Sequence, residues 1–193
     1  FMKQIFYLLL CIPFIGFAQD SYIPEDGSHI TYYSNGSIRA DQHYLNGKRH
    51  GITTLYYENG NIKAKNEYKD DKWNGLVIGY NVNGVKVREI SFKNEIKHGP
   101  AKGWYDNGKL EFEGNYIDGI LDGQNKAWYD NGQLKWIENY ILGKKNGVAK
   151  NWYQSGKIRA KGNFENDSGR LSFYLEDGTF QQTVYFKDGV PVE

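Results

Sequence analysis

The sequence contains little cysteine and proline, and it has no long run of charge of one sign. Cys11 is the only cysteine, so no disulfide can close within the chain, and packing and backbone pairing must hold the fold. The 24 Lys and Arg residues balance 23 Asp and Glu residues and leave a net charge of +1. Nucleic-acid binding depends on an excess of clustered basic residues, so a nucleic-acid partner is not expected.

A markedly apolar run occurs at the start of the sequence. The segment FMKQIFYLLLCIPFIGFAQD places Lys3 ahead of an apolar stretch that ends near the small residues Gly16 and Ala18. This order is typical of a secretory signal peptide, and the run is shorter than the roughly 20 residues that span a bilayer. We therefore expect residues 1–18 to be a signal peptide and the mature chain to begin at Gln19, with no membrane-spanning segment.

A lipid anchor at Cys11 is the competing interpretation of this segment. The residue before a lipidated cysteine should be small, whereas Leu10 precedes Cys11. Cleavage after Ala18 is therefore favoured. The sequence predicts an exported protein, but it does not distinguish a periplasmic, cell-surface or secreted location.

Glycine recurs along the chain at a constant interval. A 24-residue spacing, shortened to 22 at the end, connects Gly36, Gly60, Gly84, Gly108, Gly132, Gly156 and Gly178. Aromatic residues precede each of these glycines, and another follows eight positions later, from Tyr44 to Phe186. Fixed periods of roughly 20 to 50 residues mark repeat proteins, whose units bury their apolar faces by stacking. We expect a repeat domain at residues 30–189, a lead-in at 19–29 and a tail at 190–193.

Each unit has the pattern of a β-hairpin. In residues 104–116, WYDNGKLEFEGNY, two strand-like runs flank Asn107-Gly108, and Asn-Gly favours a tight turn because both residues tolerate positive φ. The second run alternates apolar or small residues with polar ones, the first set being Leu110, Phe112, Gly114 and Tyr116. The predicted fold is all-β, an elongated, twisted single sheet of stacked antiparallel hairpins with a shallow trough.

The pattern leaves two local features open. A two-residue turn would set Tyr105 opposite Leu110, whereas a three-residue turn with a bulged glycine would reverse the choice and bring in Trp104. In the third unit, Val85 and Val87 stand where polar residues are expected, which indicates a slipped or bulged hairpin. Which aromatic column is buried therefore depends on the turn.

Aromatic pairs supply the candidate partner-binding residues. Three consecutive units contain them, as Trp104, Tyr105, Trp128, Tyr129, Trp152 and Tyr153. Exposed aromatic ladders can anchor a protein or stack on a sugar. At least one of the two columns is expected to belong to the core.

No catalytic, metal-binding or cofactor-binding site is predicted. His50 and His98 occupy equivalent positions before glycines, and one repeat separates such positions by about 10 Å, which indicates turn residues and not shared metal ligands. Asp118 and Asp122 lack the ligand spacing of a calcium loop. Phosphate loops and nucleophile elbows are also missing from the sequence, so we expect a non-enzymatic protein without a cofactor.

The aromatic pair, Asn-Gly, a following Leu or Ile and a Tyr eight residues later resemble the MORN repeat in its bacterial variant form. Residues 56–75, YYENGNIKAKNEYKDDKWNG, and 128–147, WYDNGQLKWIENYILGKKNG, show the resemblance best. It covers residues 30–189. The sequence departs from it at residues 80–83, at residues 167–169, and at Asp71 and Glu95, where glycine is usual.

The resemblance implies a binding or scaffold protein. Similar proteins include the YwqK-type antitoxins, which are thought to neutralise a partner protein, while other MORN proteins act as scaffolds or contact membrane lipids. A protein partner is accordingly the first expectation for this chain. The alternatives are a cell-envelope module that binds glycan or lipid, and a purely structural spacer without a saturable ligand.

Overall fold

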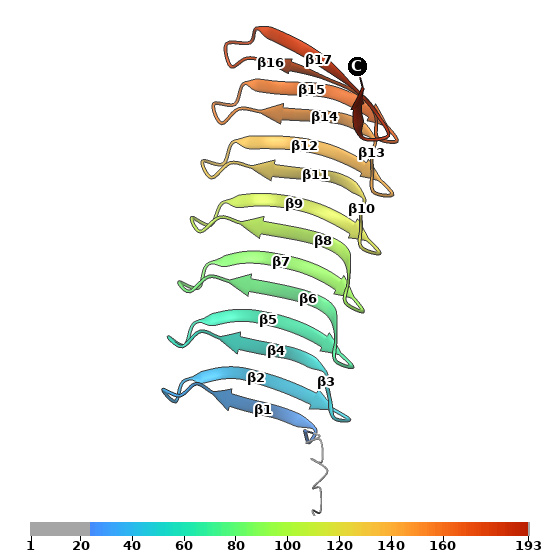
Figure 1. Cartoon of the computed structure of the whole chain (residues 1–193). Helices are drawn as coiled ribbons and strands as arrows, with labels where there is room; N and C mark the ends of the chain where they lie inside the picture. The colour runs from blue at the N-terminus through green and yellow to red at the C-terminus, as the bar shows by residue number, and fades with distance from the viewer. Residues whose placement is uncertain (1–23, 193) are drawn as a thin grey trace, which may run out of the picture.

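The computed structural model describes residues 24–192, so the predicted signal peptide, its cleavage site and Cys11 lie outside the described residues. Within them the chain forms one antiparallel sheet of 18 strands and no helix. Seven pairs of long strands stack as an elongated ladder of hairpins (Figure 1). The predicted all-β fold of stacked hairpins is confirmed.

Each hairpin pairs two long strands. The first strands are β1 (Gly27–Tyr32), β4 (Gly51–Tyr56), β6 (Lys72–Tyr80), β8 (Ile96–Trp104), β11 (Gly123–Trp128), β14 (Gly147–Trp152) and β16 (Ser168–Tyr174). Their partners are β2 (Ile38–Leu45), β5 (Ile62–Lys69), β7 (Lys86–Lys93), β9 (Leu110–Ile117), β12 (Leu134–Ile141), β15 (Ile158–Glu165) and β17 (Phe180–Lys187).

Four short strands complete the sheet: β3 (Lys48–Arg49), β10 (Ile120–Leu121), β13 (Lys144–Lys145) and β18 (Val190–Val192). Strand structure therefore extends beyond the predicted domain limits of 30 and 189. At the N-terminal end Gly27 pairs with Tyr44, and at the C-terminal end Val190 pairs with Lys187. The glycine period marks the turns and gives no signal for how far the outermost strands continue.

The turn inside each hairpin, here called the first turn, has three residues. In the fourth hairpin the Tyr105 amide donates to the Lys109 carbonyl oxygen, and the Gly108 amide donates to the Tyr105 carbonyl oxygen, each at 2.9 Å. Gly108 has a φ of 79°, the left-handed conformation that such a loop requires. This geometry pairs Trp104 with Leu110 and so resolves the alternative that the sequence left open.

A β-bulge follows the first turn. Gly103 pairs with Phe112 and Trp104 with Leu110, so Glu111 has no partner in the register. Leu110 and Phe112 therefore lie on opposite faces, and the predicted single-face alternation is wrong at this step. The other hairpins have the same register shift. The third hairpin has the same bulge and the same pairing as the others, so Val85 and Val87 do not mark an exceptional unit.

The register assigns every buried residue to one face of the sheet, which we call the inner face. Within residues 24–192 these residues are Ala40, Thr53, Asn66, Tyr68, Ala101, Gly103, Asn125, Ala127, Ala149, Ala160, Phe164 and Leu171. Small residues suit this face because larger neighbours cover them. A Cβ at Gly103 would collide with the Phe112 ring. The side chains of a single sheet thus form its core.

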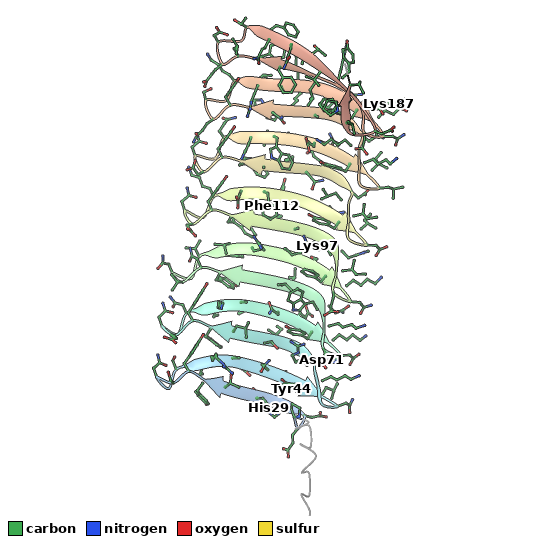
Figure 2. All side chains as sticks on the ribbon, viewed as in Figure 1. His29, Tyr44, Asp71, Lys97, Phe112 and Lys187 are labelled. Carbon is green, nitrogen blue, oxygen red and sulfur yellow. The ribbon has the colours of Figure 1, made fainter. Side chains whose placement is uncertain are left out.

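One column of the inner face consists of Tyr and Phe rings stacked under side chains that lie just after the preceding second turn. The Arg49 guanidinium lies 4.2 Å from the centre of the Tyr68 ring, and the Lys97 ammonium lies 4.9 Å from that of Tyr116. At the N-terminal end the His29 and Tyr44 rings meet edge to face at 5.1 Å (Figure 2). The aliphatic stems of Arg49 and Lys97 shield the rings below them, while their charged groups stay in water.

The turns that lead out of each hairpin, here called the second turns, lie along the opposite edge of the ladder (Figure 1). Both residues of each turn have positive φ: Asn46-Gly47, Asp70-Asp71, Asn94-Glu95, Asp118-Gly119, Leu142-Gly143, Asn166-Asp167 and Asp188-Gly189. This is the two-residue turn whose twist matches that of the strands. The second residue also ties its turn to the segment that follows the preceding second turn, since the Gly119 amide donates to the Lys97 carbonyl oxygen at 2.8 Å.

Candidate binding surface

The three tyrosines among the predicted site residues connect consecutive units. The hydroxyl of Tyr105 donates to the carbonyl oxygen of Trp128 at 2.7 Å. Tyr129 and Tyr153 repeat this bond with Trp152 and Tyr174, each at 2.9 Å. Tyr33 and Tyr57 do the same near the N-terminal end. Burial, helped by the nearby Glu111 and Asp130 carboxylates, raises the pKa of Tyr105.

Bulged basic residues lie over the rings of two of these tyrosines, Tyr129 and Tyr153. The Lys135 ammonium lies 5.4 Å from the centre of the Tyr129 ring, and the Arg159 guanidinium lies 5.8 Å from that of Tyr153. In Tyr129 and Tyr153 the hydroxyl and the ring are therefore both in contact with other parts of the protein. The tyrosine column links consecutive units of the ladder.

The first-turn asparagines also connect units. The Asn107 Oδ1 accepts a hydrogen bond from the Lys109 amide at 3.0 Å, while its Nδ2 donates to the Asp130 carbonyl oxygen of the next unit at 2.9 Å. The turn glycines next to this column all have positive φ, between 79° at Gly108 and 94° at Gly178. Short polar side chains and glycine thus allow the first turns to stack directly on one another.

The three tryptophans lie on the other face, which we call the outer face. Register pairs Trp104 with Leu110, Trp128 with Leu134 and Trp152 with Ile158. Aromatic and aliphatic side chains therefore alternate in a band along the sheet, and all three tryptophans are partly buried within it. The Lys86 ammonium also lies 4.2 Å from the centre of the Trp104 ring.

Exposed large apolar side chains gather on the outer face. On its strands they are Ile30, Tyr32, Ile38, Leu45, Ile52, Leu76, Ile96, Ile117, Ile120, Ile141, Val148, Phe180, Tyr185, Val190 and Val192. The remaining three, Val82, Leu142 and Leu175, lie in turns. Scattered exposed apolar residues are ordinary, but their collection on one face indicates an interaction surface.

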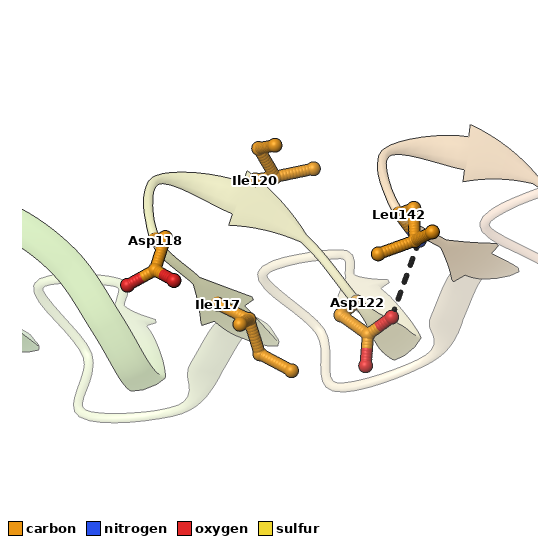
Figure 3. Close-up of a pocket in the computed structure, with 5 residues that line it drawn as sticks. All are labelled: Ile117, Asp118, Ile120, Asp122 and Leu142. Atoms are coloured by element: carbon orange, nitrogen blue, oxygen red, sulfur yellow. Dashed lines mark hydrogen bonds between the residues drawn. The ribbon is translucent and has the colours of Figure 1, made fainter.

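Two of the hollows along the second-turn edge differ sharply in chemical character. An aliphatic hollow of about 120 Å³ is lined by Ile117, Asp118, Ile120, Asp122 and Leu142 (Figure 3). A basic hollow of about 450 Å³ is lined by Lys48, Lys69, Asp70, Lys72, Asn74, Lys93 and Asn94. Sequence reasoning missed both hollows. The residues beside the second turns could have revealed them, because they change from Lys69 and Lys72 in the second unit to Ile117 and Ile120 in the fourth.

The histidines and carboxylates of the second turns form paired contacts. His98 Nδ1 lies 3.1 Å from Asp118 Oδ1, and His50 Nδ1 lies 3.7 Å from Asp70 Oδ1. Across residues 24–192 no group of three or more His, Cys, Asp or Glu side chains is arranged to hold a metal ion. The same residues include no helix long and apolar enough to cross a membrane.

The protein is a β-hairpin repeat protein, a class that binds or scaffolds other molecules. Its turns stack on one another, its tyrosine hydroxyls bond to the next unit, and its exposed apolar side chains gather on one face. The repeat described as the MORN repeat variant matches residues 25–46, 49–70, 97–118, 121–141 and 145–166. These segments cover more than half of the chain, which therefore belongs to the MORN repeat variant family. Its members are generally non-enzymatic.

The matched segments leave out residues 71–96, which contain the third hairpin. That hairpin nevertheless has the same turn and bulge as its neighbours, because Tyr80 pairs with Lys86 and Gly79 with Arg88. Its departures from the repeat pattern therefore alter side chains and leave the backbone architecture intact. No curated protein matches the sequence.

Proposed function

We propose that this chain is an exported, non-enzymatic binding protein that holds a protein partner on its outer face. The observation that supports this most directly is the distribution of exposed apolar side chains, which lie on that face or in turns. The inner face is used for the protein's own packing. A surface of partly buried tryptophans among exposed aliphatic residues has the composition from which protein interfaces draw their anchors.

The composition of the outer face favours a protein over a glycan. Sugars stack on open aromatic rings, whereas Trp104, Trp128 and Trp152 are partly buried between aliphatic neighbours. Of the 15 exposed large apolar side chains on the strands of this face, 12 are Ile, Leu or Val, and the aromatic three, Tyr32, Phe180 and Tyr185, lie in the first and last hairpins, away from the tryptophans. Branched aliphatic side chains fill pockets in a polypeptide partner but offer a sugar no flat surface.

An antitoxin-like role is one form that such binding could take. Its support is the resemblance to partner-neutralising proteins, together with the apolar side chains exposed along the outer face. The predicted signal peptide would place the encounter outside the cytoplasm. A gene for a toxic protein next to this one would support that role.

Site-directed photo-crosslinking in the cells that make the protein tests the proposal. Photoreactive residues at Ile52 and Val148 would report on the outer face, and residues at Arg88 and Gln182 would report on exposed positions of the inner face. We expect a protein adduct from the outer positions alone. Adducts from the inner positions alone, a polysaccharide in place of a protein, or no adduct would each contradict the proposal.

A further inference from the structure

One second turn breaks the chemical pattern of the others. Its first position holds Asn or Asp elsewhere, as Asn46, Asp70, Asn94, Asp118, Asn166 and Asp188, but Leu142 in the fifth unit. Leu142 has a φ of 49°, which is unfavourable for a residue with a bulky apolar side chain, and it is 76% exposed. Neither backbone geometry nor burial accounts for a leucine there. Such outliers gather at functional sites.

Leu142 forms one wall of the aliphatic hollow. Ile117 and Ile120, which pair directly across the preceding second turn, form the opposite wall (Figure 3). They are 44% and 48% exposed, and Ile96 at 49% and Ile141 at 54% extend the apolar surface. The hollow is about 120 Å³, which suits a single aliphatic side chain of a partner.

The basic hollow lies further toward the N-terminus on the same edge. Its lining contains four lysines and one carboxylate, that of Asp70. Lys69 and Lys72 are directly opposite each other across the turn, where like charges destabilise a strand pair. Within the described residues, none of the lysines lining this hollow forms an ion pair with a carboxylate. Bound anionic groups would relieve this repulsion.

The two hollows are aligned on the outer face, about two and a half units apart. Each unit adds two strand spacings of about 4.8 Å, so their centres are roughly 24 Å apart, a distance that about seven extended residues span. We propose that this edge binds an extended segment of the partner protein in which an acidic cluster and a large aliphatic side chain are about seven residues apart. The inference rests on the proposed function, which makes the partner a protein.

Charge at the aliphatic hollow favours a polypeptide over an anionic lipid surface. The Asp118 side chain at the hollow's rim is 73% exposed, and Asp122, which accepts a hydrogen bond from the Leu142 amide at 3.3 Å, also lines it. A membrane would bring its headgroup phosphates against these carboxylates as well as against the lysines. A peptide can place its negative charges at the basic hollow alone.

Fluorescence anisotropy with a synthetic peptide tests the proposal. The probe is a labelled peptide of about 12 residues with three aspartates, a neutral spacer and a leucine about seven residues further on. We expect saturable binding that weakens from about 0.05 M to about 0.5 M salt. We expect Leu142→Asn to raise the Kd about tenfold or more while making the protein harder to unfold, because asparagine tolerates this φ.

Two further variants separate local charge from general charge. Lys69→Gln with Lys72→Gln should weaken binding, whereas Lys187→Gln, at the equivalent position of the last unit, should leave it unchanged. A control peptide with the aspartates moved next to the leucine should bind worse than the probe. The proposal is wrong if Leu142→Asn binds like the parent or if the two peptides bind equally.

Vesicles containing anionic lipid provide the remaining comparison. If the parent binds vesicles, the Leu142 and Lys69/Lys72 variants do not, and the peptide fails to bind, then the edge is a lipid surface and the proposal is wrong. If outer-face crosslinking captures a protein but neither hollow's variants affect its capture, this inference fails while the proposed function stands. If crosslinking captures no protein, the proposed function fails.

Discussion

The hydroxyl of Tyr105 donates a hydrogen bond to the main-chain carbonyl oxygen of Trp128, one unit further along the chain, at 2.7 Å. The tyrosine thus fixes the position of the tryptophan that follows it in the next hairpin. Two residues that are adjacent in sequence therefore have different tasks. Tyr105 links units through the first turns, and Trp104 contributes to the outer face.

Removing the hydroxyl from Tyr105 or Tyr129 should destabilise the protein. We expect Tyr105→Phe and Tyr129→Phe each to lower the free energy of unfolding by about 1 kcal/mol, because a partly buried carbonyl oxygen loses its donor. Urea denaturation measures the effect. Tyr185→Phe is the control, since Tyr185 is 52% exposed and its hydroxyl has no protein partner in the described chain. An equal loss in the control would contradict this role.

A side chain at a first-turn glycine should be costly because of backbone conformation. Gly132 has a φ of 91°, and an added Cβ would meet nothing closer than Lys109 at 3.6 Å. We expect Gly132→Val to lower the free energy of unfolding by about 1–2 kcal/mol and Gly132→Asn to lower it less. A thermal melt of Gly132→Val identical to that of the parent would refute the turn assignment.

A glycine introduced at a second turn should stabilise the protein. Glu95 has a φ of 67° at a position that holds glycine in other units, such as Gly119. Relief of this conformation outweighs the added entropy of an unfolded glycine, so we expect Glu95→Gly to raise the free energy of unfolding by about 0.5 kcal/mol. Chemical denaturation should show the opposite change for Gly119→Glu. Destabilisation by Glu95→Gly would show that other contacts of Glu95 dominate.

Acid should weaken the tie at Asp71. Hydrogen bonds from the Arg49 side chain and amide hold the pKa of Asp71 below its ordinary value. The stability that depends on this ionised carboxylate is present above about pH 4 and is lost as the pH falls through the lower pKa of the folded state.

The pair is partly exposed, with 33% of Arg49 and 47% of Asp71 accessible, so its contribution should stay below about 1 kcal/mol. We expect the free energy of unfolding of Asp71→Asn to fall less steeply below about pH 4 than that of the parent. Glu58→Gln serves as a control for general carboxylate removal. The assignment fails if the parent and Asp71→Asn have parallel pH profiles.

Export gives a prediction about the mature N-terminus. The small residues Gly16 and Ala18 favour cleavage before Gln19, so intact-mass measurement of the native protein should find a chain that begins there. A mature chain that begins with a lipidated Cys11 would instead anchor the protein to a membrane.

The sequence predicts the repeat length and the hairpins well, but it does not predict which face of the sheet each side chain occupies. Seven glycines at intervals of 24 residues, with a last interval of 22, mark the first turns, and Asn-Gly indicates hairpins, so the stacked architecture follows from composition and spacing. The side on which Leu110 lies does not follow, because one bulged residue, Glu111, reverses the alternation. A bulge has no composition of its own, and only the pairing with the preceding strand reveals it.

The candidate surface was only partly predictable for a related reason. Tyr129 and Trp128 are both aromatic and adjacent, and the hydrogen bond that occupies Tyr129 joins it to a residue one unit away. The sequence does not single out Leu142, because the second turns have glycine in only some units and their positions in the repeat are therefore harder to align. Pairing across the turn shows that this leucine occupies a position suited to asparagine or aspartate.

The ladder has one weak rung along its first-turn edge. Asn81 replaces the tyrosine there, and its Nδ2 reaches the exposed Asp106 carboxylate at 2.8 Å in place of a strand carbonyl oxygen. The opposite edge keeps its main-chain tie at this level, since the Gly119 amide still bonds to Lys97. We expect this exposed hydrogen bond to open more readily than the partly buried tyrosine bonds on the same edge. The ladder should then bend most easily at this level, with the first turns spreading apart and the second turns acting as the pivot, so that its curvature can follow a partner's surface.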